Sequence, residues 1–354
     1  MTEFPSSNHS DGLVYVSKPG GHRGPYVSLF ADKLQFSGLI APPSFRVMRQ
    51  LIATPRLLLA TFEESLPMFS IVLAARAVLG RPTAGIFLSP QRCFIKSELK
   101  CRLKKLAFMI YKRVPGLTLF TITPFSLEPR FAEVANVGAY DPQYWDMHDG
   151  ESITLPKPTA FSDEILKQAS GRSIICLPGS LNAEKGFPFL AEILQANPSL
   201  SDSVLVVAAG KVQANASDAA RIFVANGGVL FNRRIEDDEL ESLYRIANAV
   251  WCCYEPRYDQ ASGIFGRAMQ FGIPVIVRKS SLIERFAAST PLPVISVAYG
   301  DKQQAASLLA STIPPRLAGE SFARHADAIA SWRDHFIQAL ETALQCDRKC
   351  SGKA

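Results

Sequence analysis

Asp259-Gln-Ala-Ser-Gly-Ile-Phe-Gly-Arg-Ala-Met-Gln-Phe-Gly-Ile-Pro-Val-Ile-Val277 is the stretch that decides the predicted fold. The apolar run 249–254 before it has the length and bulk of a buried strand. Ser262 and Gly263 then form a turn that suits a helix N-cap, and apolar residues recur at helical spacing up to Gly272, a C-cap signal. The end of the stretch begins another strand. Strand, tight turn, helix and strand make one unit of a parallel sheet.

The helix that follows Ser262 has an N-terminus suited to an anion. Its first backbone N–H groups have no acceptor inside the helix, and the positive end of the helix dipole lies there. In a parallel sheet such helix ends lie at the carboxyl edge of the strands. The sequence therefore predicts an anion site at Ser262, Gly263 and Ile264.

Short apolar runs alternate with helical patterns along the whole chain, which is typical of parallel α/β domains. The strands expected in the first half are 13–17, 57–61, 84–88, 117–122 and 133–137. Those expected in the second half, besides the two above, are 173–177, 204–209, 229–231 and 294–297. The polar, turn-rich segment 148–160 reads as a linker. We therefore expect one domain over 1–155, a second over 156–330, and a terminal helix and tail over 331–354.

Two loops of the second half add candidates for the same edge. The strand 173–177 is followed by Gly179 and Ser180 and then by Lys185-Gly186, and Gly210 follows the strand 204–209. Glycine lets the backbone approach a ligand closely.

These motifs resemble a known family. The pattern acidic-x-x-Ser-Gly-x-x-x-x-Ala-Met-x-x-Gly-x-Pro-Val-Ile is similar to the donor-site signature of GT-B glycosyltransferases, in particular the retaining family 4, and Lys185-Gly186 resembles the end of that family's Gly-Arg-Leu-x-x-x-Lys-Gly loop. The resemblance implies an α/β fold of two Rossmann-like domains with parallel sheets facing an interdomain cleft, and a terminal helix that returns to the first domain. It also implies transfer of a hexose from a nucleotide-diphosphate donor to a polysaccharide or polyprenyl-linked acceptor, retaining, with no metal and no other cofactor.

The resemblance also implies roles for residues on the donor side. The diphosphate is expected on Lys185 and the Ser262-Gly263-Ile264 helix terminus, bordered by Gly179, Ser180 and Gly210. Asp259 stands at the first of the family's two glutamates and is expected to orient the donor sugar as a catalytic residue.

Two donor positions depart from the family pattern. Ser180 takes the place of the loop arginine, and Arg267 the place of the second glutamate, which contacts the ribose. Losing that carboxylate forfeits roughly 1.5–3 kcal/mol per charged hydrogen bond. Glu255 as a substitute carboxylate and Arg267 as a diphosphate ligand both remain open.

The glycine-rich turn after the first strand supplies the candidates for the acceptor side. Gly20, Gly21, His22 and Arg23 lie between a strand and a helix, and in GT-B enzymes the corresponding loop faces the cleft. His22 is therefore a catalytic candidate with Arg23 beside it. The alternative is that both are ordinary surface-loop residues.

The segment 92–113 carries eight basic residues and one acidic residue. Ile95, Leu99, Leu103, Leu106, Ile110 and Val114 recur every three or four residues, beside a basic row of Lys96, Lys100 and Lys104. Such a helix either lies on an anionic membrane surface or packs its apolar stripe into the core with its charges in water. A nucleic-acid partner is not expected, because no aromatic platform accompanies the charge.

Composition bounds the class of protein. The chain has 354 residues, 47% of them apolar and 20% charged, without an apolar run of membrane-spanning length. Its polar start gives no secretory signal, and seven scattered cysteines with no Cys-x-x-Cys pair predict reduced thiols rather than disulfides or zinc. We therefore expect a cytoplasmic protein, peripheral on the inner face of the plasma membrane if 92–113 docks there.

Two other functions remain open. The substitutions at Ser180, Asp259 and Arg267 are compatible with a catalytically degenerate GT-B protein that binds a sugar nucleotide or a partner in polysaccharide assembly. A nonhydrolysing sugar-nucleotide epimerase on the same fold ranks lower, because the Lys-Gly and Ala-Met-x-x-Gly-x-Pro-Val elements favour family 4.

Overall fold

The computed structural model describes residues 2–3, 11–20, 23–95, 98–147, 156–260, 262–290, 292–315 and 326–345. The chain divides into two compact units, Met1–Pro142 with Ser331–Ala354, and Gln143–Ala330. The prediction put the end of the first domain at residue 155, within the undescribed stretch 148–155.

The first unit contains a seven-stranded sheet in the order β1-β3-β2-β4-β5-β6-β7. Its strands are β1 (Thr2–Glu3), β2 (Gly12–Val16), β3 (Ser37–Ile40), β4 (Arg56–Leu59), β5 (Thr83–Phe87), β6 (Leu117–Thr121) and β7 (Val137–Gly138). All neighbouring pairs are parallel except β1 with β3. The α-helices of this unit are α1 (Arg23–Leu34), α2 (Phe45–Ala53), α3 (Leu66–Val78), α4 (Leu99–Tyr111) and most of α13 (Ala326–Leu344).

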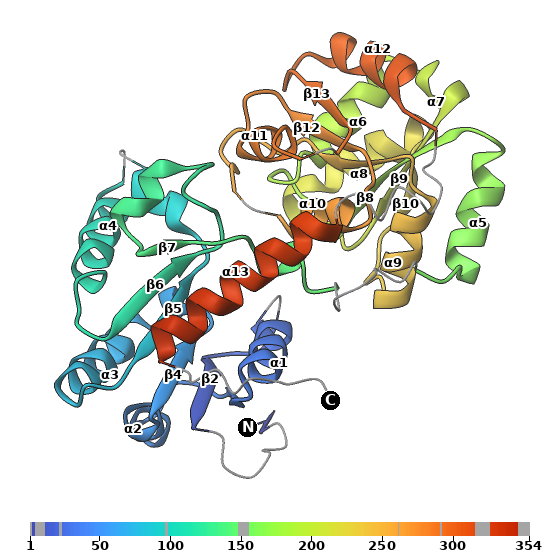
Figure 1. The fold of residues 1–354 in the computed structure, drawn as a ribbon. Coiled ribbons are helices and arrows are strands. Elements are labelled where there is room, and N and C mark those ends of the chain that lie inside the picture. Colours follow the sequence, from blue (N-terminus) through green and yellow to red (C-terminus); the bar gives the residue numbers. More distant parts are fainter. Residues whose placement is uncertain are drawn as a thin grey trace. The chain divides into compact units, whose positions relative to one another are not determined.

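Helices lie on both faces of this sheet (Figure 1), and contacts between aromatic side chains hold them there. On one face α2, α3 and α4 share a core with the strands, in which the Phe87 and Phe108 rings stack with centroids 3.8 Å apart. On the other face Phe336 of α13 contacts Phe30 of α1 at 5.6 Å and Phe120 of β6 at 5.7 Å. Burial of this large aromatic surface on both sides stabilises the unit.

The second unit contains a wholly parallel six-stranded sheet in the order β10-β9-β8-β11-β12-β13. Its strands are β8 (Ser173–Pro178), β9 (Val204–Ala209), β10 (Val229–Phe231), β11 (Ala249–Cys252), β12 (Val275–Arg278) and β13 (Val294–Val297). The helices are α5 (Ala160–Ala169), α6 (Phe187–Ala196), α7 (Leu200–Ser203), α8 (Ser217–Ala225), α9 (Asp237–Ile246), α10 (Gly263–Gln270), α11 (Leu282–Ala287) and α12 (Lys302–Thr312).

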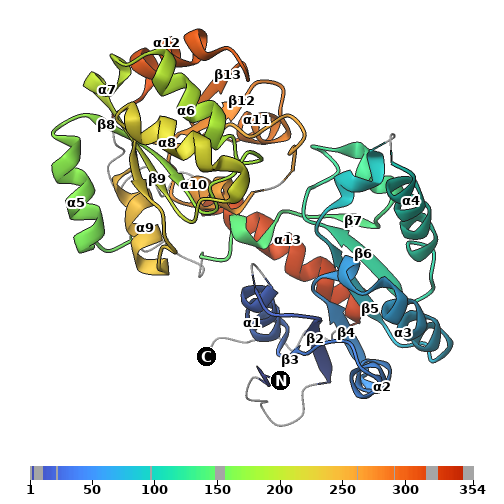
Figure 2. The same cartoon turned by 180° about the vertical axis from the view of Figure 1, so that it is seen from behind.

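Helices cover both faces of the second sheet as well (Figure 2). Helices α6, α7, α8 and α12 share one core with the strands. On the other face Tyr244 of α9 lies 5.8 Å from Phe271, and Phe265 of α10 lies 5.2 Å from Phe286 of α11, measured between ring centroids. The four central strands β8, β9, β11 and β12 are buried on both sides, which explains their continuous apolar runs.

The predicted α/β class and parallel sheets are confirmed, with corrections in detail. The strand expected at 133–137 is wrong: Glu133 ends a short 3₁₀ helix, and β7 begins only at Val137. Strand β3 and helix α2 were not predicted, because β3 has only four residues and two of them are Ser and Gly. The acidic run at 237–241 is the start of α9, where Glu236 and Glu239 form a capping box and the carboxylates favour the helix dipole.

Candidate functional site

Two glycine loops meet at the carboxyl edge of the second sheet. Strands β8 and β9 run in parallel register and end side by side, at Pro178 and Ala209. Gly179 and Gly210 follow with φ angles of +93° and +152°. A Cβ atom on Gly210 would lie 1.7 Å from the carbonyl oxygen of Gly179, so only glycine fits there. Bare backbone therefore forms this part of the edge, with Ser180 exposed beside it.

Lys185 and the N-cap of α10 come together at the same edge. Lys185 Nζ lies 3.4 Å from Ser262 Oγ, which in turn lies 2.6 Å from the hydroxyl of Tyr254. The ammonium also sits over the rings of Tyr254 and Tyr258, 4.3 and 4.6 Å from their centroids. Burial raises the pKa of Tyr254 well above its ordinary value, so its phenol stays neutral. Lys185 thus supplies the positive charge of this cluster, and the faces of the two tyrosine rings hold its ammonium in place.

Gly186 lets the loop that carries Lys185 lie close to the end of β11. Its φ is +72°, and a Cβ atom would lie 2.1 Å from the carbonyl oxygen of Cys253. The backbone N–H of Lys185 donates to Asn182 Oδ1 at 2.9 Å. A glycine at 186 therefore allows the close backbone approach that positions the Lys185 ammonium.

The N-terminus of α10 is contacted by the chain's own segment 143–147. Ser262 is the N-cap, as predicted, but its side chain makes no capping bond, and its backbone N–H donates to the Tyr144 hydroxyl at 3.3 Å. A Cβ atom on Gly263 would lie 1.8 Å from Gln143 Oε1. One side of the first helical turn is therefore occupied by protein, while Ile264 lies on the side of Gly179.

Arg267 and Gln270 of α10 hold the 143–147 segment. Both terminal nitrogens of Arg267 donate to the carboxylate of Asp146, with Nη2 and Oδ2 2.9 Å apart. The buried Gln270 amide donates to the Gln143 carbonyl at 2.8 Å and accepts the Met147 N–H at 3.1 Å. The guanidinium that stands at the family's second glutamate position is thus engaged in a bidentate ion pair.

Asp259 and Glu255 lie in the loop between β11 and α10. Asp259 Oδ1 accepts from Arg278 Nη2 at 2.9 Å and from the backbone N–H of Leu282 at 2.8 Å, which ties it to the start of α11. Its side chain remains 37% exposed. Glu255 is partly buried, and its backbone N–H donates to the Glu184 carbonyl at 3.1 Å. The predicted sugar-orienting carboxylate is therefore present and held, but paired with an arginine.

In the first unit, the carboxyl ends of β2 and β4 carry a polar cluster centred on Glu64. Glu64 accepts from Ser17 Oγ at 2.9 Å and from Thr61 Oγ1 at 3.2 Å, and pairs with Arg23. Arg23 Nη1 also donates to the Gly20 carbonyl at 2.9 Å. His22 and Gly21 lie outside the described residues. Sequence reasoning missed Glu64 as a site residue, although polar residues following two neighbouring strands are a signal for it.

The apolar side chains of α4 face solvent. Ile95, Leu99, Leu103, Leu106 and Ile110, which we call the α4 stripe, have exposed fractions between 41% for Ile95 and 67% for Leu99. The buried face of this helix carries Cys101 and Phe108 instead. The alternative in which the apolar row packs into the core is therefore wrong for these five side chains, whereas Val114, the last member of the predicted row, packs against the core. Exposed Lys100 and Arg102 flank the stripe on its two sides, while Lys96 lies outside the described residues.

Among the described residues, no group of three or more His, Cys, Asp or Glu side chains is placed to hold a metal ion. Within that same part of the chain, no helix is both long enough and apolar enough to cross a bilayer. The five cysteines it contains are free thiols.

Several solved structures resemble this chain at low sequence identity. WaaG, a glycosyltransferase involved in lipopolysaccharide biosynthesis, is 14% identical with a TM-score of 0.58 over 93% of this chain and 99% of that one. A UDP-forming α,α-trehalose-phosphate synthase from Burkholderia xenovorans is 14% identical with a TM-score of 0.56 over 95% and 99%. HepE from Anabaena, solved with UDP and glucose, is 14% identical with a TM-score of 0.54 over 95% and 98%.

The sequence matches no protein-family model and no curated protein. The structural likeness nevertheless spans nearly the whole length of each chain, and both sheets are parallel apart from the pairing of β1 with β3. The protein therefore has the GT-B fold, which the 259–277 stretch predicted.

Proposed function

We propose that this protein transfers a hexose from a nucleotide-diphosphate donor to a saccharide acceptor. The observation that carries the proposal is the 3.4 Å approach of Lys185 Nζ to Ser262 Oγ at the N-terminus of α10. It brings an ammonium and a helix terminus to the glycine-lined edge of a parallel sheet, where pyrophosphates bind. HepE, of the same fold, was solved with UDP and glucose, so UDP-sugars are the first donors to test.

The proposed chemistry uses Lys185 to stabilise the departing nucleoside diphosphate. Negative charge builds on the leaving phosphate oxygen, and a preorganised ammonium beside a helix terminus stabilises it without reorganisation. Retention of configuration and independence of a metal ion follow the family 4 resemblance. Asp259 would orient the donor sugar with the free oxygen of its carboxylate, because Oδ1 is already taken by Arg278 and Leu282.

The acceptor is proposed to be a growing polysaccharide or a polyprenyl-linked saccharide, bound on the first unit. Arg23 is held by Glu64 at the carboxyl edge of that sheet, a place where sugar hydroxyls meet charged hydrogen-bonding groups. Gly20, whose φ is +105°, keeps the backbone of this loop accessible.

We further propose that the α4 stripe and its flanking cations attach the protein to the anionic inner face of the plasma membrane. Exposed apolar side chains with Lys100 on one side of the stripe and Arg102 on the other suit an interfacial helix. Each basic residue near an anionic membrane surface contributes about 1 kcal/mol. Flotation with phosphatidylglycerol vesicles tests this attachment. Equal flotation with neutral vesicles would rule out the electrostatic contribution.

Calorimetric titration with UDP and a panel of nucleotide sugars, followed by assays of nucleotide release, tests the transferase proposal. We expect Lys185→Ala to weaken donor binding about ten- to a hundredfold, since it removes a charged contact to phosphate. Lys167→Ala, an exposed lysine on α5, is the matched control and should bind as the unaltered protein does. Unchanged affinity in Lys185→Ala would refute the proposed diphosphate site.

A binding protein without turnover is the second candidate, and the two ion pairs at donor positions favour it. Arg267 is paired with Asp146, and Asp259 with Arg278, so both donor-position side chains already have protein partners. Donor binding that depends on Lys185, without product for any acceptor tested, would establish this second function. Product formation excludes it.

A further inference from the structure

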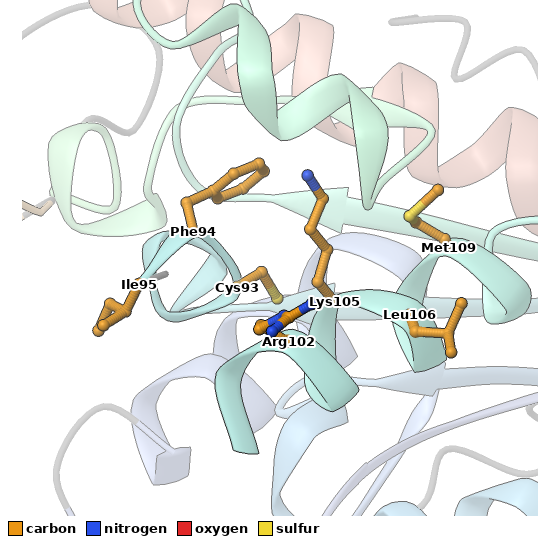
Figure 3. A pocket seen from close by; sticks show the side chains of 7 residues that line it. All are labelled: Cys93, Phe94, Ile95, Arg102, Lys105, Leu106 and Met109. Atoms are coloured by element: carbon orange, nitrogen blue, oxygen red, sulfur yellow. The ribbon is translucent and has the colours of Figure 1, made fainter. Parts of the chain in front are cut away.

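A pocket of about 530 Å³ lies beside α4 in the first unit. It opens between α4 and η2 (Pro90–Phe94), a short 3₁₀ helix that follows β5. Its walls include Phe94, Ile95, Arg102, Lys105, Leu106 and Met109 (Figure 3). This volume is within the range of sites that hold small organic ligands.

Two cations stand in the pocket on neighbouring turns of α4. Arg102 is exposed, and no described residue forms an ion pair or hydrogen bond with its guanidinium. Lys105 extends between Phe94 and Met109, with Nζ 2.5 Å from Glu133 Oε2 and 4.6 Å from the Phe94 ring centroid (Figure 3). Because Lys105 and Glu133 are both partly exposed, their pairing is weak enough for a stronger anion to share the lysine.

The apolar part of the pocket is continuous with the α4 stripe. Ile95 and Leu106 belong to both, and Met109 extends the same surface along the helix. A ligand with its anionic group between Arg102 and Lys105 therefore finds hydrocarbon contacts leading outward along exposed side chains. A small hydrophilic anion would leave this surface unused.

The ring contacts of Phe94 argue against a nucleotide in this pocket. Lys105 Nζ and Arg130 Cζ lie over the ring, 4.6 and 5.3 Å from its centroid, so the aromatic surface that a base would stack on already faces cations. The ligand that suits both the cations and the apolar walls is a phosphate group attached to a hydrocarbon chain.

We propose that this pocket binds one phosphate-bearing lipid, with the phosphate between Arg102 and Lys105 and the chain along Leu106, Met109 and Ile95. The site would fix a single lipid in the membrane surface proposed above, and it rests on that proposal only for the source of its ligand. Bilayer attachment needs the whole stripe, whereas the pocket needs only its own walls, so the two ideas can be separated.

A monomeric lipid separates them experimentally. Dihexanoyl phosphatidylglycerol, kept below the concentration at which it forms micelles, is titrated calorimetrically into the full-length protein, with farnesyl phosphate as a second probe and inorganic phosphate as a third. We expect saturable one-to-one binding of at least one lipid, and none of inorganic phosphate at the same concentration. Tighter binding of farnesyl phosphate would identify an isoprenoid lipid as the ligand, and tighter binding of phosphatidylglycerol a bilayer lipid.

Matched variants on the same helix identify the site. Arg102→Ala and Leu106→Gln, which alter the pocket, should weaken monomer binding about tenfold or more. Lys100→Ala and Leu99→Gln change exposed neighbours that do not line it, and should leave monomer binding unchanged while weakening vesicle flotation. Equal effects of the two sets on monomer binding, or no saturable binding of either lipid, would overturn the pocket even if the protein still floats with vesicles.

Discussion

Gly263 and Gly266 of α10 show how a single missing methyl group shapes the site. A Cβ atom on Gly266 would lie 2.2 Å from Tyr144 Cδ1 and 2.5 Å from the backbone oxygen of Gln143, whereas one on Gly263 would meet the end of the Gln143 side chain. The absence of a Cβ atom at both positions thus makes room for the 143–147 segment. Only the contact at Gly266 involves backbone, which cannot move away cheaply.

We therefore expect Gly266→Ala to lower the free energy of unfolding by about 1–3 kcal/mol, and Gly263→Ala by less, because the Gln143 side chain can rotate. Urea denaturation measures both. Gly24→Ala in α1, where an added Cβ meets nothing within 4 Å, is the control and should be neutral or slightly stabilising. Equal losses at 263 and 266 would contradict the packing argument.

Arg76 is a buried cation of α3 bound almost entirely by backbone. Burial lowers its pKa to about 10, and its guanidinium donates to five oxygens, those of Leu51 O, Thr54 O, Pro55 O, Pro82 O and Thr83 Oγ1. Arg76→Met would remove a donor from each of these oxygens, of which Pro82 O keeps the backbone N–H of Leu57 at 3.3 Å. We expect a loss of about 3 kcal/mol in the free energy of unfolding, against no measurable change for Arg221→Met, whose side chain is 81% exposed. A small loss at Arg76 would mean that water replaces the guanidinium.

Individual site residues were predictable where the sheet itself brings them together. Lys185 and Ser262 each follow a strand of one parallel sheet, and the carboxyl ends of such strands share an edge, so their 3.4 Å contact could be anticipated. The pairing of Asp259 with Arg278 could not, because Arg278 ends the next strand and the contact depends on how the intervening loop folds back. The pairing of Arg267 with Asp146 was not predicted either, because it depends on where the 143–147 segment lies against α10.

At the scale of elements, the 143–147 segment and α10 behave as one unit, held by Arg267, Gln270 and Asp146. We expect Arg267→Ala and Asp146→Ala each to lower the free energy of unfolding by about 1–2 kcal/mol, and the double variant to cost less than their sum, because the second change removes a partner already lost. Thermal or urea unfolding of the four proteins completes the cycle. Strict additivity would show that the ion pair contributes nothing.

Helix α4 marks the limit of periodicity as a predictor. The spacing of its apolar residues correctly indicated a helix with one apolar stripe, yet it left open whether that stripe faces core or solvent. The structure places Phe108 against Phe87 and leaves the stripe outside. What decides the orientation is the shape of the neighbouring surface, which local sequence does not contain.

For the molecule as a whole, the order of strands and helices was predictable, because a parallel sheet buried on both faces requires continuous apolar runs that are easily seen. Short elements such as β3 were not, since four residues carry too little pattern. Both sheets follow from the sequence far better than the side-chain pairs at their edges do.

The buried thiols and phenols make stability sensitive to alkali. Burial raises the pKa of Cys252 to about 12 from its ordinary 9.0, and that of Tyr15 to about 12 from 10.0. At a pH between the ordinary and the raised pKa of each group, the unfolded chain has lost a proton that the native protein retains. The free energy of unfolding therefore falls as pH rises above about 9. Urea midpoints at about pH 8 and about pH 10 check this. A midpoint that holds or rises over that interval would contradict it.

Because the side chains of the α4 stripe are exposed and lie outside the core, they can be replaced by polar residues without loss of the fold. In water alone, these side chains make a sticky patch, and we expect purified protein to self-associate as it is concentrated. Replacing Leu99, Leu103 and Ile110 together with glutamine should keep the unfolding midpoint and suppress that association, which light scattering measures. Substitutions in the same solvent-facing stripe that suits a bilayer would then yield protein suited to crystallisation.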